Sequence, residues 1–241
     1  MIPSAVERPL ATFVSTVERV AGGRLAAVYL VGGVALGDFS PRQSNIDLVV
    51  VCDPPLGAEE VSSLRRAERQ LQRAGRPAAV WYSGWDEIAD GPSGDPAARS
   101  PLETPMTRAM LREEAVAYVG PDWPVVAYDE AAFREWCRRS LEELVAGRHG
   151  LLIWRRDVSP LVLQAARLAQ GAATGRVLSK TEAGEGSITL LPAHFRRILH
   201  DAAGYRNGAN FSMYYGPFER KYDTRLLFRQ LVEAVRAEPR I

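Results

Sequence analysis

Asp47 is an acidic residue inside an otherwise apolar segment, residues 46–52, which reads IDLVVVC. The segment predicts a strand, and residues two apart in a strand point to the same face, so Asn45 and Asp47 should share one face. Because burying a carboxylate inside a strand costs free energy, Asp47 should serve a ligand. Carboxylate and amide oxygens are ligands that Mg²⁺ accepts, and the pair is therefore a candidate metal site.

Two adjacent glycines, Gly32 and Gly33, follow the preceding apolar segment, residues 25–31, which also predicts a strand. Glycines let backbone N–H groups approach an anion closely, and a short helix expected over residues 34–36 adds positive potential at its N-terminus. A phosphate cradle that faces the oxygen pair suits a Mg²⁺–triphosphate. A tight turn with a solvated aspartate is the alternative, but the Ser-x-Ile-Asp-Leu stretch at residues 44–48 favours phosphate and metal.

The pattern over residues 32–51 resembles the nucleotidyltransferase superfamily, which includes the aminoglycoside adenylyltransferases and DNA polymerase beta. The resemblance implies that the turn at Gly32 and Gly33 grips the triphosphate of ATP, the co-substrate. It also implies that Ser44 precedes a pair of carboxylates that binds Mg²⁺, and that Asp47 takes the second place of this pair.

Asn45 departs from the family pattern, because the first place of the pair is usually an aspartate. An amide offers one oxygen but no charge, so a second metal should bind more weakly. The resemblance also implies a third carboxylate, with Glu103, Asp86 and Glu87 as candidates. Glu103 is preferred as the general base, and a carboxylate that stabilises a helix start is the alternative. For Asp86 and Glu87 the alternative is a solvated loop.

Three further segments resemble the streptomycin/spectinomycin adenylyltransferase group, whose helical C-terminal domain supplies the acceptor pocket: residues 104–121, 166–180 and 190–208. By this resemblance Lys180 contacts the nucleotide phosphates, and Glu182 and Glu185 hold a cationic acceptor. Gly186 stands where those members have an aromatic residue, which argues against streptomycin itself. An ordinary polar loop between two helices is the alternative for all three charged residues.

These residues require two domains to position them. We predict an α/β (α+β) nucleotidyltransferase domain with a short mixed sheet at residues 1–124, and an all-α, helical substrate-binding domain at residues 125–241. The apolar spacing predicts helices at residues 5–21, 59–74, 104–116, 130–147, 150–171 (with a break at Ser159 and Pro160), 192–207 and 220–237, and strands at 25–31, 46–52, 77–82 and 118–119. The aromatic-rich residues 205–223 could line a pocket, but a packed connection between helices is favoured.

The composition excludes several classes of protein. The 30 Lys and Arg residues nearly balance the 29 Asp and Glu residues, which argues against a broad nucleic-acid footprint. Two distant cysteines, Cys52 and Cys137, argue against a zinc site or a disulfide framework. Without a signal peptide or a run of about 18 apolar residues, we expect a soluble, cytoplasmic monomer with no membrane partner.

These features together predict an enzyme that moves AMP from Mg²⁺-ATP to a hydroxyl of a small, cationic, aminoglycoside-like acceptor, as in antibiotic resistance. Two alternatives stay open. The acceptor could be a protein side chain or a tRNA end, although tRNA would need clustered basic residues. Alternatively, Asn45 and the unclear base could mark a catalytically degenerate member that binds a nucleotide or an antibiotic.

Overall fold

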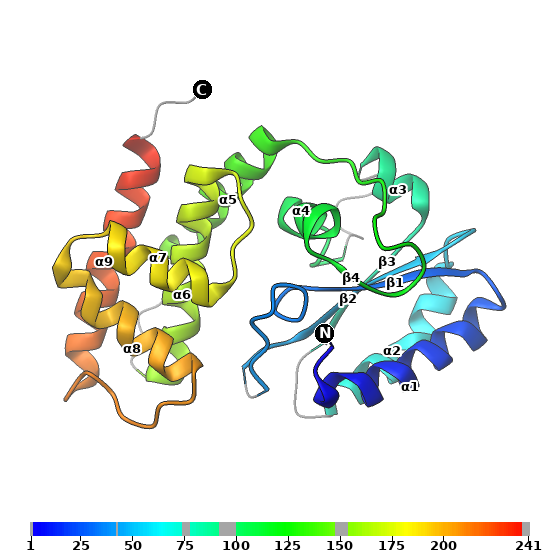
Figure 1. Cartoon of the computed structure of the whole chain (residues 1–241), viewed down its shortest axis with the longest axis horizontal. Helices are drawn as coiled ribbons and strands as arrows, with labels where there is room; N and C mark the ends of the chain where they lie inside the picture. Colours follow the sequence, from blue (N-terminus) through cyan, green and yellow to red (C-terminus); the bar gives the residue numbers. More distant parts are fainter. Residues whose placement is uncertain (1, 42, 74–77, 92–99, 148–153, 238–241) are drawn as a thin grey trace. The chain divides into compact units, whose positions relative to one another are not determined.

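The computed structural model describes residues 2–41, 43–73, 78–91, 100–147 and 154–237. The chain divides into two compact units, Met1–Asp129 and Glu130–Ile241. Figure 1 shows that the N-terminal unit contains the sheet, whereas the C-terminal unit consists of helices and their connections. The predicted fold class, a small mixed sheet with helices followed by a helical domain, is confirmed.

The N-terminal unit is built on a four-stranded mixed sheet with the strand order β3-β2-β1-β4. β1 (Leu25–Val31) pairs antiparallel with β2 (Ile46–Cys52) and with β4 (Val116–Val119), while β3 (Ala78–Ser83) runs parallel to β2. β1 and β2 have the predicted bounds. Val31, the last residue of β1, is in register with Asp47 on β2, so the carboxylate lies at the end of the sheet where β1 enters its loop.

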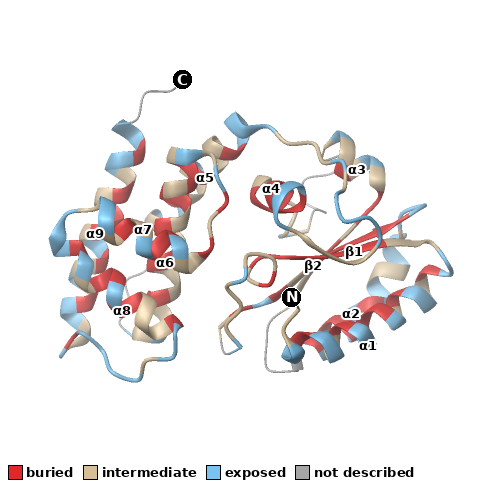
Figure 2. Cartoon of the chain, in the orientation of Figure 1, coloured by how far each residue is buried: buried red, intermediate tan, exposed pale blue. Residues whose placement is uncertain are grey.

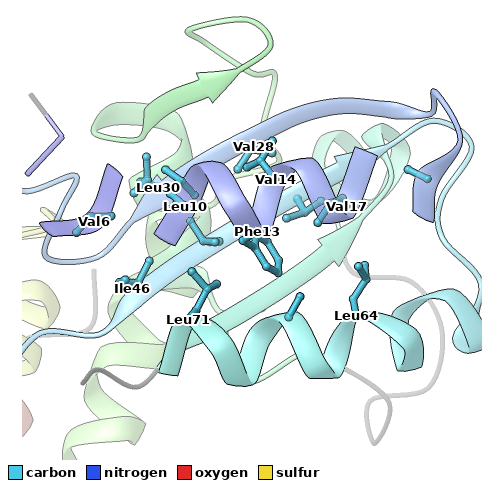
Figure 3. Packing of buried hydrophobic residues seen from close by; sticks show 14 of the residues in the cluster. Val6, Leu10, Phe13, Val14, Val17, Val28, Leu30, Ile46, Leu64 and Leu71 are labelled. Atoms are coloured by element: carbon cyan, nitrogen blue, oxygen red, sulfur yellow. The ribbon is translucent and has the colours of Figure 1, made fainter. Parts of the chain in front are cut away.

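Helices α1 (Ser4–Ala21) and α2 (Ala58–Arg73) pack together on one face of this sheet. Alternate residues of the two central strands join the helices in one buried apolar cluster (Figure 3), including Val28, Leu30, Ile46, Leu48 and Val50. Figure 2 shows that the outer sides of both helices are exposed. Because side chains alternate along a strand, Asp47 points to the opposite face of the sheet.

The opposite face is met by helix α4 (Pro105–Glu113), which contacts β1. The backbone N–H of Gly32 donates a hydrogen bond to Sδ of Met110 on this helix at 3.2 Å. The guanidinium of Arg108 lies over the ring of Trp81 on β3, 5.1 Å from its centroid. Residues of α4 therefore lie on the same side of the sheet as Asp47.

The C-terminal unit is a helical bundle around α6 (Arg155–Thr174), most of whose residues are buried or half-buried. A 3₁₀ turn at Ala193–Phe195 leads into α8. Helix α6 packs against α5 (Glu130–Ala146), α7 (Lys180–Leu190), α8 (Arg196–Arg206) and α9 (Pro217–Ala237).

The predicted break at Ser159 and Pro160 is wrong, because α6 continues through both residues. Pro160 lies in the second turn of the helix, where its ring crowds the carbonyl of Arg156. Because Arg156 is exposed, this carbonyl can tilt toward water and the helix can continue. The predicted start of this helix at residue 150 lies outside the described residues.

Two other helix predictions also need correction. The short helix expected over residues 34–36 is part of a hydrogen-bonded turn at residues 32–37. The helix expected over residues 104–116 ends at Glu113, because Val116 pairs with Leu30 and extends the sheet.

Two segments predicted as loops are helical. Residues Trp85–Asp90 form α3, which includes Asp86 and Glu87, and both carboxylates lie in its first turn, where the helix dipole favours them. The segment at Lys180 begins α7. The start of α7 is fixed by a capping box, a local sequence signal described below.

Candidate active site

Asp47 and Gly32 are in close contact at one end of the sheet. A Cβ atom on Gly32 would lie only 2.7 Å from Oδ2 of Asp47, and the backbone of Gly32 has a φ of +65°. Residues with a side chain rarely adopt this backbone conformation. Both the backbone and the neighbouring carboxylate therefore require glycine at position 32, and Asp47 lies directly beside the turn that was predicted to bind phosphate.

The turn at residues 32–37 offers backbone donors to an anion. It is closed by a hydrogen bond from the N–H of Leu36 to the carbonyl of Gly32 at 3.1 Å. As in the first turn of a helix, the preceding N–H groups have no partner within the turn. Those of residues 33–35 form no backbone hydrogen bond within the part of the chain that the structure describes. Such donors bind phosphate oxygens in glycine-rich turns.

Ser44 shapes the loop that follows this turn. Its buried hydroxyl accepts a hydrogen bond from the N–H of Ser40 at 2.8 Å, and its own N–H donates to the carbonyl of Ser40, also at 2.8 Å. A Cβ on Gly33 would lie 3.3 Å from Oγ of Ser44. Ser44 therefore lies against the second glycine and holds the loop in place.

The two predicted metal ligands differ in their surroundings. Asn45 is exposed and precedes β2, while Asp47 is half-buried within β2. The residues in register with Asp47 on the neighbouring strands are Val31 on β1 and Ala79 on β3. Residues in register on adjacent strands point to the same face, so the neighbours of the Asp47 carboxylate on both strands are apolar.

The donor set beside the turn fits one Mg²⁺ ion that arrives with a triphosphate. Such an ion is commonly held by one or two carboxylates together with phosphate oxygens and water, and Asp47 supplies one carboxylate. Asn45 can add an amide oxygen but no charge. Among the described residues, no group of three or more His, Cys, Asp and Glu side chains could hold a metal ion.

Glu103, the preferred general base, is buried beside Arg108. Its side chain is only 3% exposed, and its Oε1 lies 3.9 Å from Nη2 of Arg108. Arg108 also donates to the carbonyls of Ile88 and Glu87 at 3.0 Å each, in the middle of α3. The Glu103 carboxylate therefore lies beside a buried guanidinium, which itself lies on the face of the sheet that carries Asp47.

Asp86 and Glu87 lie toward the other end of the sheet. In the parallel pairing of β2 and β3, Asp47 is in register with Ala79, whereas Ser83 is in register with Val51. Four residues along a strand span about 13 Å, and both carboxylates follow Ser83. The hydroxyl of Ser83 donates to Oε2 of Glu87 at 2.6 Å, so this carboxylate links the end of β3 to the first turn of α3.

Tyr29 lies two residues before Val31 and faces the same side of the sheet as Asp47. Its hydroxyl donates to the carbonyl of Pro121 at 2.9 Å. Burial, together with the negative charge of Asp122, raises the pKa of Tyr29 to about 12. Tyr29 is therefore a neutral donor that joins β1 to the segment after β4, and it cannot serve as a base near neutral pH.

The remaining predicted residues lie on α7 in the C-terminal unit. The N–H of Ser179 donates to Oε2 of Glu182 at 2.8 Å, and the N–H of Glu182 donates to Oγ of Ser179 at 3.1 Å, which completes a capping box. Glu182 is thereby engaged in starting the helix. Lys180, the first residue of α7, is half-buried, and Glu185 is exposed one turn further on.

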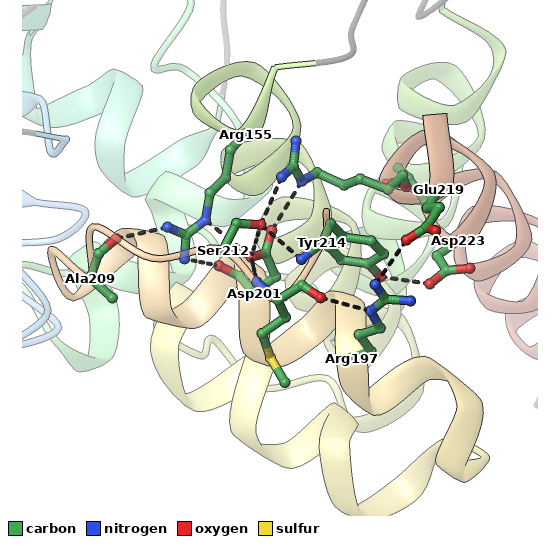
Figure 4. Close-up of polar contacts among 11 residues, drawn as sticks. Arg155, Arg197, Asp201, Ala209, Ser212, Tyr214, Glu219 and Asp223 are labelled. Atoms are coloured by element: carbon green, nitrogen blue, oxygen red, sulfur yellow. Dashed lines mark hydrogen bonds and ion pairs between the residues drawn. The ribbon is translucent and has the colours of Figure 1, made fainter. Parts of the chain in front are cut away.

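The C-terminal unit contains a buried ion-pair network that the sequence analysis does not predict (Figure 4). The side chain of Asp201 is fully buried, with Oδ1 3.2 Å from Nε of Arg155 and Oδ2 3.1 Å from Nε of Arg220. The hydroxyl of Ser212 donates to Oδ1 at 2.9 Å. These partners lie far apart in the chain, and no spacing pattern links them.

The network fixes the connection between α8 and α9, within the aromatic-rich residues 205–223. The N–H of Met213 donates to Asp201 at 2.9 Å, and the hydroxyl of buried Tyr214 donates to Asp223 at 2.6 Å. The expected packing of this connection therefore rests on polar contacts. Most of its large apolar side chains are exposed: Phe211, Met213, Tyr215, Phe218 and Tyr222.

Within the described residues, no helix is both long enough and apolar enough to cross a membrane.

Comparisons with known proteins agree with this architecture. Residues 128–217 match the family model "Aminoglycoside adenylyltransferase, C-terminal domain". Among solved structures, the spectinomycin adenyltransferase AAD(9) from Enterococcus faecialis, determined with ATP and spectinomycin, matches with a TM-score of 0.71 and 14% sequence identity. The match covers 96% of this chain and 99% of that chain, and at this identity it establishes the fold. No curated protein sequence matches the chain.

The family model and the structural match rest on different kinds of evidence. The first rests on the sequence of the C-terminal unit, and the second on the arrangement of nearly the whole chain. Both agree with the resemblance found in the sequence. The helical domain therefore resembles the C-terminal domain of the aminoglycoside adenylyltransferases by sequence, and nearly the whole chain shares the fold of AAD(9).

Proposed function

We propose that the protein transfers AMP from Mg²⁺-ATP to a hydroxyl of a small, cationic, aminoglycoside-like acceptor. The observation that carries this proposal is the contact between Asp47 and Gly32, which joins a carboxylate to a turn whose N–H groups at residues 33–35 form no backbone hydrogen bond among the described residues. A magnesium triphosphate needs both partners, because its phosphates take N–H donors and its metal takes a carboxylate. The family model over residues 128–217 and the matched fold support the same reaction class.

The proposed roles follow from what each side chain can supply. The N–H groups after Gly32 bind phosphate oxygens, and Ser44 keeps the loop beside Gly33 in shape. Asp47, with the amide of Asn45, would hold the Mg²⁺ that the nucleotide brings. The ion supplies positive charge to the phosphates when it is bound. Lys180 adds a second cation on a flexible stem, which suits phosphate oxygens.

The acceptor is proposed to bind to the helical unit, through the carboxylates of α7. AAD(9) was determined with spectinomycin, which supports an antibiotic as acceptor. Glu185 is exposed, whereas Glu182 already accepts a hydrogen bond from the N-cap of α7. We therefore expect Glu185 to contribute more than Glu182 to holding a cationic group.

Glu103 is the proposed base only if its carboxylate can reach the acceptor hydroxyl. Its burial beside Arg108 favours the counter-ion role. The two roles differ in their kinetics. As a base, Glu103→Gln lowers kcat with an unchanged affinity for ATP; as a counter-ion, it lowers stability and affects kcat and affinity together.

The proposal is tested with ATP labelled at the α-phosphate, Mg²⁺ and a panel of aminoglycosides that includes spectinomycin. We expect label to move to at least one antibiotic with wild-type protein, and none to move with Asp47→Asn. Glu113→Gln, which removes an exposed carboxylate of α4, is the matched control and should transfer label normally. Absence of label on every acceptor would exclude this panel as substrates.

A second candidate function is a binding module that holds a nucleotide or an antibiotic without transferring AMP. It is favoured by the apolar neighbours of Asp47, Val31 and Ala79, because few charges remain to assist the reaction. Retained binding of Mg²⁺-ATP together with no transfer to small molecules, proteins or tRNA would support this function over the first.

A further inference from the structure

Asp47 lies between two strands that contribute no side-chain oxygen at its level. Its partner in register on β1 is Val31, and its partner in register on β3 is Ala79. Adjacent strands lie about 4.8 Å apart, so side chains at these positions are the nearest that the sheet can offer to the Asp47 carboxylate. A carboxylate could stand at position 79, but the chain has a methyl group there.

The other candidate ligands do not make up this deficit. Asn45 is exposed and uncharged, and Glu103 faces the guanidinium of Arg108. In the described part of the chain, no set of three acidic, histidine or cysteine side chains is arranged to hold a metal. Mg²⁺ demands near-octahedral oxygen coordination and gives up its water reluctantly, so one carboxylate alone binds it weakly.

We propose that the described residues around Asp47 form no metal site of their own and that this site takes only the one Mg²⁺ that the triphosphate carries, because Ala79 and Asn45 stand where acidic residues would complete a site around Asp47. This inference rests on the nucleotide-binding role proposed above and specifies its metal requirement. Positions 45 and 79 thereby set how many metal ions the site accepts.

Position 79 is partly open to solvent. Ala79 and Asp47 are both half-buried rather than enclosed, so a longer side chain can extend toward solvent beside the carboxylate. Two adjacent carboxylates repel each other unless a cation lies between them. Ala79→Glu combined with Asn45→Asp should therefore create a cation site that the natural chain lacks.

Binding of Mn²⁺ without nucleotide, followed by electron paramagnetic resonance, tests this inference independently of the reaction. We expect the Asn45→Asp/Ala79→Glu double variant to bind one Mn²⁺ at least tenfold more tightly than the wild type. The Asn45→Asp/Ala79→Gln variant is the matched control, since it has the same size at position 79 without the charge, and it should gain far less.

Two results would overturn the inference. One is wild-type protein that binds Mn²⁺ alone as tightly as the double variant. The other is a double variant that keeps the wild-type circular dichroism and thermal transition but binds Mn²⁺ no more tightly. A failure to bind ATP would not affect the Mn²⁺ affinities of the wild type and the double variant. It would therefore count against the proposed function and not against the inference about the metal ligands of Asp47.

Discussion

The carboxylate of Asp47 occupies the space that a side chain on residue 32 would need, since a Cβ there would lie 2.7 Å from its Oδ2. Gly32 thus allows the end of β1 to turn with a positive φ and allows an acidic group to stand directly beside that turn. The contact couples the conformation of the backbone to the position of the carboxylate. A change at either residue should therefore affect both the phosphate donors and the metal ligand.

Gly32→Ala should weaken nucleotide binding strongly, and Gly37→Ala should not. Both glycines have a similar positive φ, +65° and +63°, so each substitution by alanine should introduce about 1–2 kcal/mol of backbone strain. A Cβ on Gly37 meets nothing within 4 Å, whereas a Cβ on Gly32 displaces Asp47. Titration of ATP in the presence of Mg²⁺ should show at least a tenfold loss of affinity for Gly32→Ala and less than a twofold loss for Gly37→Ala. Equal losses in both variants would show that strain alone matters.

Asp47→Asn should lower the affinity for Mg²⁺-ATP at least tenfold and leave the fold intact. The substitution keeps the size of the side chain but removes the charge that a cation requires. Because Asp47 is half-buried at the end of the sheet, the free energy of unfolding should change by less than about 1 kcal/mol. Calorimetric titration and urea unfolding measure the two quantities separately. Unchanged affinity would remove Asp47 from the site.

Asp201→Asn should destabilise the C-terminal unit strongly. It leaves the buried guanidinium groups of Arg155 and Arg220 without their counter-charge, and breaking such a network costs about 3–5 kcal/mol. The exposed pair of Arg197 and Glu219 provides the control, because Glu219→Gln should cost at most about 1 kcal/mol. Urea unfolding followed by tryptophan fluorescence and circular dichroism compares them. Similar effects of both substitutions would show that the buried network contributes little.

Stability should fall as the pH rises from about 10 to 12, partly through Tyr29. Burial raises its pKa in the folded chain to about 12, so between these values the folded state keeps a proton that the unfolded state, with an ordinary phenol pKa of about 10, has lost. Tyr29→Phe should weaken this pH dependence, whereas Tyr215→Phe, at a fully exposed side chain, should not. Urea midpoints at pH 8 and pH 11 measure the difference. An equal fall in wild type and Tyr29→Phe would contradict the prediction.

The sequence was informative where local signals decide the structure. β1 and β2 follow from apolar runs bounded by glycines and by the Asp53-Pro54-Pro55 sequence. The capping box of Ser179 and Glu182 is also a local sequence signal. It specifies the start of α7 at a place where the resemblance implied a loop.

Other features depend on contacts between distant residues. The pairing of Asp47 with Ala79 depends on the parallel register of β2 and β3, which no sequence pattern fixes. The burial of Glu103 beside Arg108 depends on how α4 packs over α3 and Trp81. The convergence of Arg155 and Arg220 on Asp201 depends on the packing of three helices. Each of these bears on function, and each required the three-dimensional structure.

Hydrogen–deuterium exchange with and without Mg²⁺-ATP tests the central claim most directly, because it reports on the backbone N–H groups that are proposed to bind phosphate. We predict slower exchange in peptides that cover residues 32–47 when the nucleotide is bound, loss of this protection in Asp47→Asn, and unchanged exchange in α2 at residues 58–73. Saturating Mg²⁺-ATP that leaves exchange in residues 32–47 unchanged would contradict the assignment of the Gly32 turn and Asp47 as the nucleotide site.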